Sequence, residues 1–334
     1  MNVLLSGYYG YGNLGDEALL AGLLTPLRQA GHDVSVLSGD PAETIRLHRD
    51  TVLEGRLNAT SRYFGALPAL LRCDAFISGG GGLLQDKTSR RSLHYYLLLI
   101  RIAKLLRKKV VVYGQSIGPL SEEGRRQVAQ ALRGVSVAVR DETSRQLVAS
   151  LGIEARRVAD PALLLEPPLT PAPADAPILF IPRGGYPDIT ATLVDLADAL
   201  HQDGNALTAL ALDPERDQEA VDALRAAVPD MTEQHADTPQ QALAAIGRSC
   251  HVVSARLHGL ILGAVAERPL TGLVYDPKVA AFLGALGRPA YEAPFDLGAL
   301  LRDVRVSEPL DSHALTALHR HAEDGIDWLL RTLV

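Results

Sequence analysis

The stretch "NVLLSGYYGYGNLGDEALLAGLLTPLRQAG" (residues 2–31) sets the pattern of the whole chain. Residues 2–7 form a short apolar run typical of a buried strand, and residues 16–31 form a helical pattern closed by Gly31. A glycine-containing loop separates the two. A strand, a loop and a helix in this order begin a strand–helix–strand unit, which favours a parallel α/β sheet.

The same alternation continues along the chain. Further strand-like runs end in "LSG" at 37–39, "SGGG" at 78–81 and "YGQS" at 113–116, with helical patterns between them. The proline-rich segment 166–177 interrupts the alternation, which restarts at 178. We therefore predict two doubly wound, Rossmann-like α/β domains that face a cleft, over 1–168 and 175–310, with a C-terminal helix over 311–334 that packs across both halves.

Composition narrows the class of protein. The 334 residues are 47% hydrophobic and 22% charged, with a net charge of −6, so no overall basic field favours nucleic acid. Cys73 and Cys250 each begin an apolar strand-like run and are expected to be buried thiols rather than a disulfide, which favours a cytoplasmic protein. Neither a signal peptide nor a membrane-spanning run is expected.

Two glycine-rich loops are candidate binding segments. In the first, Gly12 and Gly15 flank Asn13 ahead of the first helix, where backbone N–H groups attract anions. The alternative is a flexible turn with Asp16 as the helix cap. In the second, "SGGGGLLQD" (78–86), Gly80 and Gly81 follow a strand and are expected to lie beneath a ligand, the alternative being a crowded domain interface.

Four basic side chains are predicted at the ends of strands, where open α/β sheets bind ligands. Arg140 ends a strand, and its alternative is a salt bridge to Asp141 or Glu142. Arg256 and His258 lie two residues apart in "SARLHGLI" (254–261), and Lys278 lies in "YDPKVAAFL" (275–283). The alternatives are a structural histidine and a solvated lysine. No residues have metal-ligand spacing.

Several of these stretches, in this order, resemble landmarks of the polysaccharide pyruvyl transferase family, specifically its CsaB-like enzymes of bacterial cell-wall polymers and S-layer anchoring. They are "YGNLGDEA", "GGGGLLQD", "GQSIGP" (114–119), "RDETS" (140–144), "DPAL" (160–163) and "SARLHGLI". The resemblance implies a fold like that of GT-B glycosyltransferases and phosphoenolpyruvate as pyruvyl donor. The family's functional positions fall on Asp16, Arg140, Arg256, His258 and Lys278.

The reaction implied by the resemblance explains these residue types. Arg140, Arg256 and Lys278 would neutralise the carboxylate and phosphate of phosphoenolpyruvate. His258 would protonate the methylene carbon, and Asp16 would act as base on an acceptor hydroxyl or orient the acceptor. The product would be a 4,6-linked ketal on N-acetylmannosamine, formed without cofactor or metal. The alternatives are a nucleotide-sugar-dependent GT-B glycosyltransferase and a catalytically silent protein that binds an anionic sugar.

The resemblance also implies a lipid-linked, N-acetylmannosamine-containing disaccharide as acceptor, and therefore a position at the inner face of the cytoplasmic membrane. Residues 93–109 place Arg101, Lys104 and Lys108 near one helical face, which is compatible with peripheral membrane contact. The favoured interpretation of that segment is a crossover helix with one core face and one solvated charged face.

Overall fold

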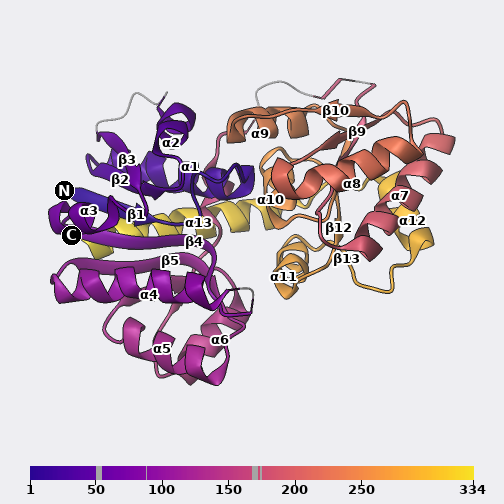
Figure 1. Ribbon diagram of the computed structural model, residues 1–334. Helices are drawn as coiled ribbons and strands as arrows, with labels where there is room; N and C mark the ends of the chain where they lie inside the picture. The colour runs from indigo at the N-terminus through magenta and orange to yellow at the C-terminus, as the bar shows by residue number, and fades with distance from the viewer. Residues whose placement is uncertain (50–54, 88, 168–171, 174) are drawn as a thin grey trace. The chain divides into compact units, whose positions relative to one another are not determined.

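The structure is a computed structural model that describes residues 1–49, 55–87, 89–167, 172–173 and 175–334. By its internal contacts the chain divides into two units. Unit 1 comprises Met1–Tyr11, Leu19–Pro161 and Arg320–Val334, and unit 2 comprises Gly12–Ala18 and Ala162–His319. Each unit is built on one sheet (Figure 1).

Unit 1 contains a seven-stranded sheet in the order β3-β2-β1-β4-β5-β6-β7, with parallel pairing between neighbours. Its strands are β1 Asn2–Ser6, β2 Asp33–Ser38, β3 Leu57–Ser61, β4 Ala75–Leu84, β5 Lys109–Ile117, β6 Ser136–Val139 and β7 Arg156–Arg157. The central strands are buried on both faces, which explains their continuous apolar runs.

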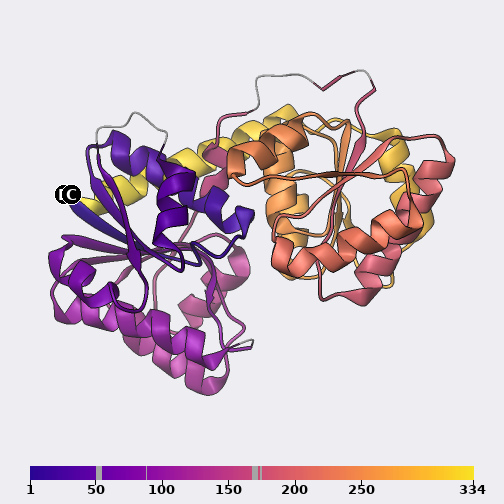
Figure 2. The same ribbon diagram turned by 45° about the horizontal axis from the view of Figure 1, so that its top comes forward.

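The helices that begin in the first half are α1 Leu14–Gln29, α2 Pro41–His48, α3 Ala66–Arg72, α4 Arg90–Leu105, α5 Glu122–Leu132 and α6 Glu142–Ser150. Helices α3, α4 and α5 share one core cluster that includes Val112 of β5. The next residue, Tyr113, points to the opposite face and stacks on Trp328 of α13 (Ser312–Leu333), with ring centroids 6.4 Å apart. The sheet of unit 1 is therefore covered on both faces (Figure 2).

Unit 2 contains a six-stranded parallel sheet in the order β10-β9-β8-β11-β12-β13. Its strands are β8 Ile178–Ile181, β9 Leu207–Leu210, β10 Thr232–Gln234, β11 His251–Ser254, β12 Leu270–Leu273 and β13 Ala290–Tyr291. Its helices are α7 Pro187–Gln202, α8 Pro214–Ala227, α9 Pro239–Gly247, α10 Leu257–Val265, α11 Pro277–Ala285 and α12 Leu297–Val306, besides the 3₁₀ turn Pro161–Leu164 that begins at the unit boundary.

The strand order reverses at one point in each sheet, between β1 and β4 in unit 1 and between β8 and β11 in unit 2. Open α/β sheets bind ligands outside the carboxyl ends of the strands at such a point. In unit 2 this point lies at the segments that follow β8 and β11. Arg256 and His258, two of the predicted site residues, lie in the second segment.

Three local expectations were wrong. The strand after Cys73 does not stop at the glycines, because β4 continues through all four of them to Leu84, with a shift of register after Gly81. Cys250 is exposed, since it precedes β11 rather than lying within it, whereas Cys73 is buried. Helix α1 begins at Leu14, two residues earlier than expected.

No helix in the described part of the chain combines the length and the apolar character needed to cross a bilayer.

Candidate functional site

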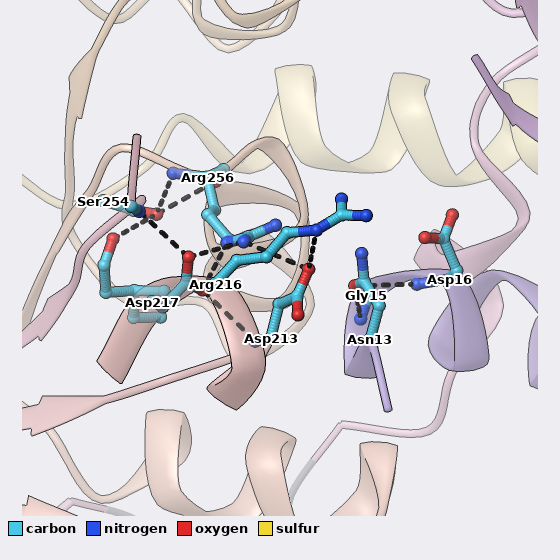
Figure 3. Close-up of polar contacts among 10 residues, drawn as sticks. Asn13, Gly15, Asp16, Asp213, Arg216, Asp217, Ser254 and Arg256 are labelled. Atoms are coloured by element: carbon cyan, nitrogen blue, oxygen red, sulfur yellow. Dashed lines mark hydrogen bonds and ion pairs between the residues drawn. The ribbon is translucent and has the colours of Figure 1, made fainter. Parts of the chain in front are cut away.

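Arg256 lies at the N-cap of α10, directly after β11, and is held by two carboxylates. Its Nε and Nη2 atoms each donate to Asp217, at 2.5 Å, and Nη2 lies 3.4 Å from Asp213 (Figure 3). The Ser254 hydroxyl accepts from the Arg256 backbone N–H at 3.0 Å and so fixes the turn. This bidentate pair uses two of the five N–H donors of the guanidinium.

Electrostatics in this group follow from its burial. Burial by itself would lower the pKa of Arg256, but the hydrogen bonds and charge of Asp217, with the charge of Asp213, raise it. Burial raises the pKa of Asp213, and the positive charges of Arg256 and Arg216 only partly offset that effect. Arg256 therefore stays protonated, and the carboxylates of Asp217 and Asp213 hold its guanidinium in place.

The first turn of α1 contacts the first turn of α10 within unit 2. The Leu14 backbone N–H donates to the Leu212 carbonyl at 2.8 Å, which fixes the start of α1 beside the end of β9. A side chain at Gly15 would overlap the ring of His258, so these two residues are in close contact. Gly15 thus has a steric reason to be glycine, and His258, in the first turn of α10, lies against the first turn of α1.

Asn13, not Asp16, caps helix α1. Its side-chain oxygen accepts from the backbone N–H groups of Gly15, at 3.0 Å, and Asp16, at 3.4 Å (Figure 3). Asp16 is a half-buried residue in the first turn of the helix. Gly12 has a φ of +73°, a backbone conformation that favours glycine. The structure therefore brings Asn13, Gly15 and Asp16 together with His258 in one unit.

Lys278 lies in the first turn of α11, after β12. Asp276 caps this helix by accepting from the Lys278 backbone N–H at 3.1 Å, and the Lys278 ammonium lies 3.4 Å from the same carboxylate. The ammonium also lies 5.9 Å from the ring centre of Tyr275. The lysine side chain is 24% exposed, so a ligand can reach it.

Sequence reasoning missed Arg183, which follows β8 at the point where the strand order reverses. Its guanidinium stacks over the ring of Tyr275, at 4.3 Å, and lies 5.3 Å from the ring of Tyr186. Within the described residues Arg183 forms no ion pair, and its buried Nε has no hydrogen-bond partner. The available signal was "IPRGG" (181–185), in which an arginine and two glycines follow a buried strand.

The remaining predicted residues belong to unit 1. Arg140 donates from Nη1 to Asp160 and from Nε to Ser116, both at 2.8 Å. Its partner is therefore neither Asp141, which caps α6, nor Glu142, which pairs with Arg145 at 2.6 Å.

The glycine run in β4 has reasons of its own. A side chain at Gly80 would overlap Leu19 of α1, and Gly81 has a φ of +81°. These constraints explain why the two positions are glycine, and their predicted place beneath a ligand stays a prediction.

No group of three or more His, Cys, Asp or Glu residues that could hold a metal ion occurs among the described residues. The predicted absence of a metal and of a cofactor stays a prediction.

Comparison with solved structures defines the class of fold. The chain is similar to MurG from Acinetobacter baumannii, with 17% identity, a TM-score of 0.54 and 99% of each chain covered. It is also similar to UDP-N-acetylglucosamine 2-epimerases from Rickettsia bellii (10% identity, TM-score 0.62, 100% of this chain and 96% of that chain) and Neisseria meningitidis (9%, 0.60, 100% and 99%). At these identities the likeness shows the fold alone, a two-domain Rossmann-like GT-B fold.

A family model described as polysaccharide pyruvyl transferase matches residues 13–277. The chain therefore belongs to the polysaccharide pyruvyl transferase family, and it is a transferase of polysaccharide pyruvylation. No curated protein matches the sequence. The match begins at Asn13 and ends at Pro277, so it includes all the predicted site residues except Gly12 and Lys278.

Proposed function

We propose that this protein transfers the pyruvyl group of phosphoenolpyruvate to an N-acetylmannosamine residue of a lipid-linked cell-wall polysaccharide precursor, in the manner of CsaB-like enzymes. The product is a 4,6-ketal, and phosphate is released. The observation that carries the proposal is the convergence of cationic side chains after β8, β11 and β12 of unit 2, which are adjacent strands.

Tyr275 connects these cations. Arg183 and Lys278 both lie near its ring, and Tyr275 also interacts electrostatically with Arg256. Asp217 and Asp276 compensate Arg256 and Lys278, but no carboxylate compensates Arg183 within the described residues. A dianionic or trianionic ligand would relieve the repulsion among like charges here. Phosphoenolpyruvate, with adjacent carboxylate and phosphate groups, has this character.

The atoms of the reaction balance without a further reactant. The enol carbon C2 of phosphoenolpyruvate gains two C–O bonds, to O4 and O6 of the sugar, while its bond to the phosphate oxygen and the π bond between C2 and C3 break. Of the two hydroxyl protons released, one balances the proton added to C3, which becomes a methyl group, and the other balances the proton on the departing phosphate. No oxidant or reductant takes part.

We assign the proton transfers to His258, in the first turn of α10, and Asp16, in the first turn of α1. His258 delivers a proton to C3. Asp16 removes a proton from an attacking hydroxyl or orients the acceptor. Arg183, Arg256 and Lys278 of unit 2 bind the donor. The binding roles predicted for Arg140, Gly80 and Gly81, which belong to unit 1, stay predictions. Gly12, Asn13 and Gly15, around the start of α1, hold Asp16 in position.

The test is phosphate release from phosphoenolpyruvate, with and without an N-acetylmannosamine-containing lipid-linked disaccharide. We expect acceptor-dependent release, addition of one pyruvyl group to the acceptor by mass spectrometry, and a loss of about 10²–10⁴-fold in kcat for His258→Ala. His235→Ala is the matched control, because His235 is an exposed histidine of the same unit. Full activity of His258→Ala would remove the histidine from the acid role.

The alternative function is a nucleotide-sugar-dependent glycosyltransferase. The GT-B fold and the tilted pair of Tyr186 and Tyr275, whose ring centroids lie 5.2 Å apart, favour it because such a pair can stack on a nucleobase. Isothermal titration distinguishes the two functions. Binding of a uridine diphosphate sugar without binding of phosphoenolpyruvate would favour the glycosyltransferase.

A further inference from the structure

An exposed apolar surface covers part of unit 1. Six of the ten large exposed hydrophobic side chains among the described residues belong to residues 63–105. They form what we call the α3–α4 face, made up of Tyr63, Phe64, Leu67, Leu71, Leu98 and Leu105. Phe64 is 91% exposed and Leu105 is 82% exposed. Side chains of this size are rarely left in water in such a group.

These residues lie on neighbouring helices on one side of the sheet. Helices α3 and α4 contribute to the same core cluster and contact each other. At one end the Tyr95 hydroxyl donates to the Arg62 carbonyl at 2.8 Å, and at the other end the Lys108 ammonium donates to the Leu71 carbonyl at 3.0 Å. Leu67 and Leu71 are one turn apart on α3, and Leu98 and Leu105 two turns apart on α4, so each pair shares an outward face.

The aromatic tip of this face is held in place. The backbone N–H groups of Tyr63 and Phe64 donate to the Ser61 hydroxyl, at 3.3 and 3.4 Å. The adjacent Arg62 is buried, and its guanidinium lies 4.3–5.5 Å from four tyrosine ring centres, the nearest being Tyr95. Phe64 is thus presented to solvent by an ordered turn, not by a loose loop.

The charged residues of the two segments that carry this face are all basic, although the exposed Asp74 directly follows the first segment. Residues 55–73 contain three basic and no acidic residues, and residues 89–109 contain seven basic and no acidic residues, in a protein with a net charge of −6. Arg72 and Arg107 are exposed beside the apolar side chains. Acidic residues resume on α5, where Glu123 pairs with Arg126 at 2.7 Å.

We propose that the α3–α4 face docks on the surface of an anionic phospholipid bilayer. Exposed aromatic and leucine side chains would enter the headgroup region, while the surrounding basic residues would attract the anionic lipid. The remaining surface, which carries the excess negative charge, would be repelled. This chemistry fixes one orientation on the membrane. The contact expected from the sequence, through residues 93–109 with Arg101, Lys104 and Lys108 on one helical face, shares part of this surface but relies on other side chains. Lys104 and Lys108 are engaged by backbone carbonyls instead.

The experiment is co-sedimentation of the full chain with vesicles of phosphatidylcholine alone and of equimolar phosphatidylcholine and phosphatidylglycerol. We expect binding to the anionic vesicles only. Phe64→Ser/Leu71→Ser and Arg72→Glu/Arg107→Glu should each weaken binding by more than about tenfold, since one basic side chain near such a surface contributes about fivefold and one buried apolar side chain about tenfold. The matched controls are Val306→Ser and Arg302→Glu, which change an exposed valine and an exposed arginine of unit 2.

Three results would overturn the proposal. They are no binding by the wild type, equal loss in the control variants, and a dimer in sedimentation equilibrium that Phe64→Ser/Leu71→Ser dissociates, which would make a second copy the occupant of the face. Circular dichroism checks that each variant is folded. The assay contains neither donor nor acceptor, so its outcome is independent of whether pyruvyl transfer is the reaction. Pyruvyl transfer to a short-chain, water-soluble acceptor should be unchanged in both face variants.

Discussion

At the scale of single residues, the predicted arginines do not have equivalent surroundings. Arg140 and Arg256 are each paired with a buried aspartate, Asp160 and Asp217. Removal of one partner of a buried ion pair costs about 3–5 kcal/mol of stability. Substitution of either arginine would therefore lower the stability of the fold as well as any affinity for the donor. Arg183 has no such partner among the described residues, which makes it the cleanest probe of donor binding.

We predict that Arg183→Gln raises the KM for phosphoenolpyruvate by about 10–100-fold, since a hydrogen bond to a charged group contributes about 1.5–3 kcal/mol. The kcat at saturation should change little, because the arginine is assigned to binding alone. Tyr275→Phe keeps the aromatic platform and should leave KM within a factor of about two. Steady-state kinetics with Arg225→Gln as control tests this, because Arg225 is an exposed arginine of unit 2 paired with Glu233. An unchanged KM in Arg183→Gln would remove Arg183 from the donor site.

At the scale of elements, β11, β12 and α12 are joined by a buried polar network. The His251 ring nitrogens contact the hydroxyls of Ser307, at 2.9 Å, and Thr271, at 2.8 Å, and Thr271 donates to Asp303 at 2.7 Å. Burial, together with the charge of Arg288, lowers the pKa of His251 to about 3. The folded protein therefore holds this histidine neutral.

This pKa shift predicts a loss of stability in acid. Because the unfolded chain binds a proton at His251 near pH 6.5 and the folded chain does not, stability is complete above about pH 6.5 and falls as the pH decreases toward 3. At pH 4.5 the neutral His251 therefore lowers the free energy of unfolding by on the order of 3 kcal/mol relative to neutral pH. We expect His251→Asn to be less stable than wild type at pH 8 but to lose less between pH 7 and 4.5. Urea unfolding at both pH values measures this, and parallel losses in the two proteins would contradict it.

The local sequence pattern was sufficient to predict the long helices and strands. It was insufficient where residues distant in the sequence determine the structure. Apolar periodicity and the predicted strand ends were enough to predict the α/β alternation and two separate parallel sheets. They also predicted that His258 and Lys278 lie at the starts of helices. The short strands β3, β7 and β10 carry little apolar signal and exist because a neighbouring strand pairs with them. The aspartate partners of Arg140 and Arg256 lie 20 and 39 residues away, beyond any local pattern.

At the scale of the whole molecule, each unit is assembled from separated parts of the chain. Gly12–Ala18 belongs to unit 2, although the residues on either side belong to unit 1. The family's N-terminal landmark therefore reaches His258 only because the chain passes through unit 2 at this point. A division at the proline-rich segment alone would separate Asp16 from the histidine with which the proposed chemistry pairs it.

The other end of the chain completes unit 1. Within residues 320–334, the side chains of Ile326, Leu329 and Leu333 are buried. The Lys109 ammonium of β5 donates to the Leu333 carbonyl at 2.7 Å. The last turns of α13 thus contribute to the core of unit 1, although the rest of unit 1 lies within residues 1–161. A large-to-small substitution in these turns should destabilise a sheet that is more than 200 residues away in the sequence.

We predict that Leu329→Ala lowers the stability of unit 1 by about 2–5 kcal/mol, because it leaves a cavity at a fully buried position. Hydrogen exchange followed by mass spectrometry should show faster exchange in β5 (Lys109–Ile117) and unchanged exchange in β11 (His251–Ser254), which belongs to unit 2. Arg331→Ala, at an exposed position two residues away, is the control. Equal acceleration in β5 and β11 would instead mean that the two units unfold as one.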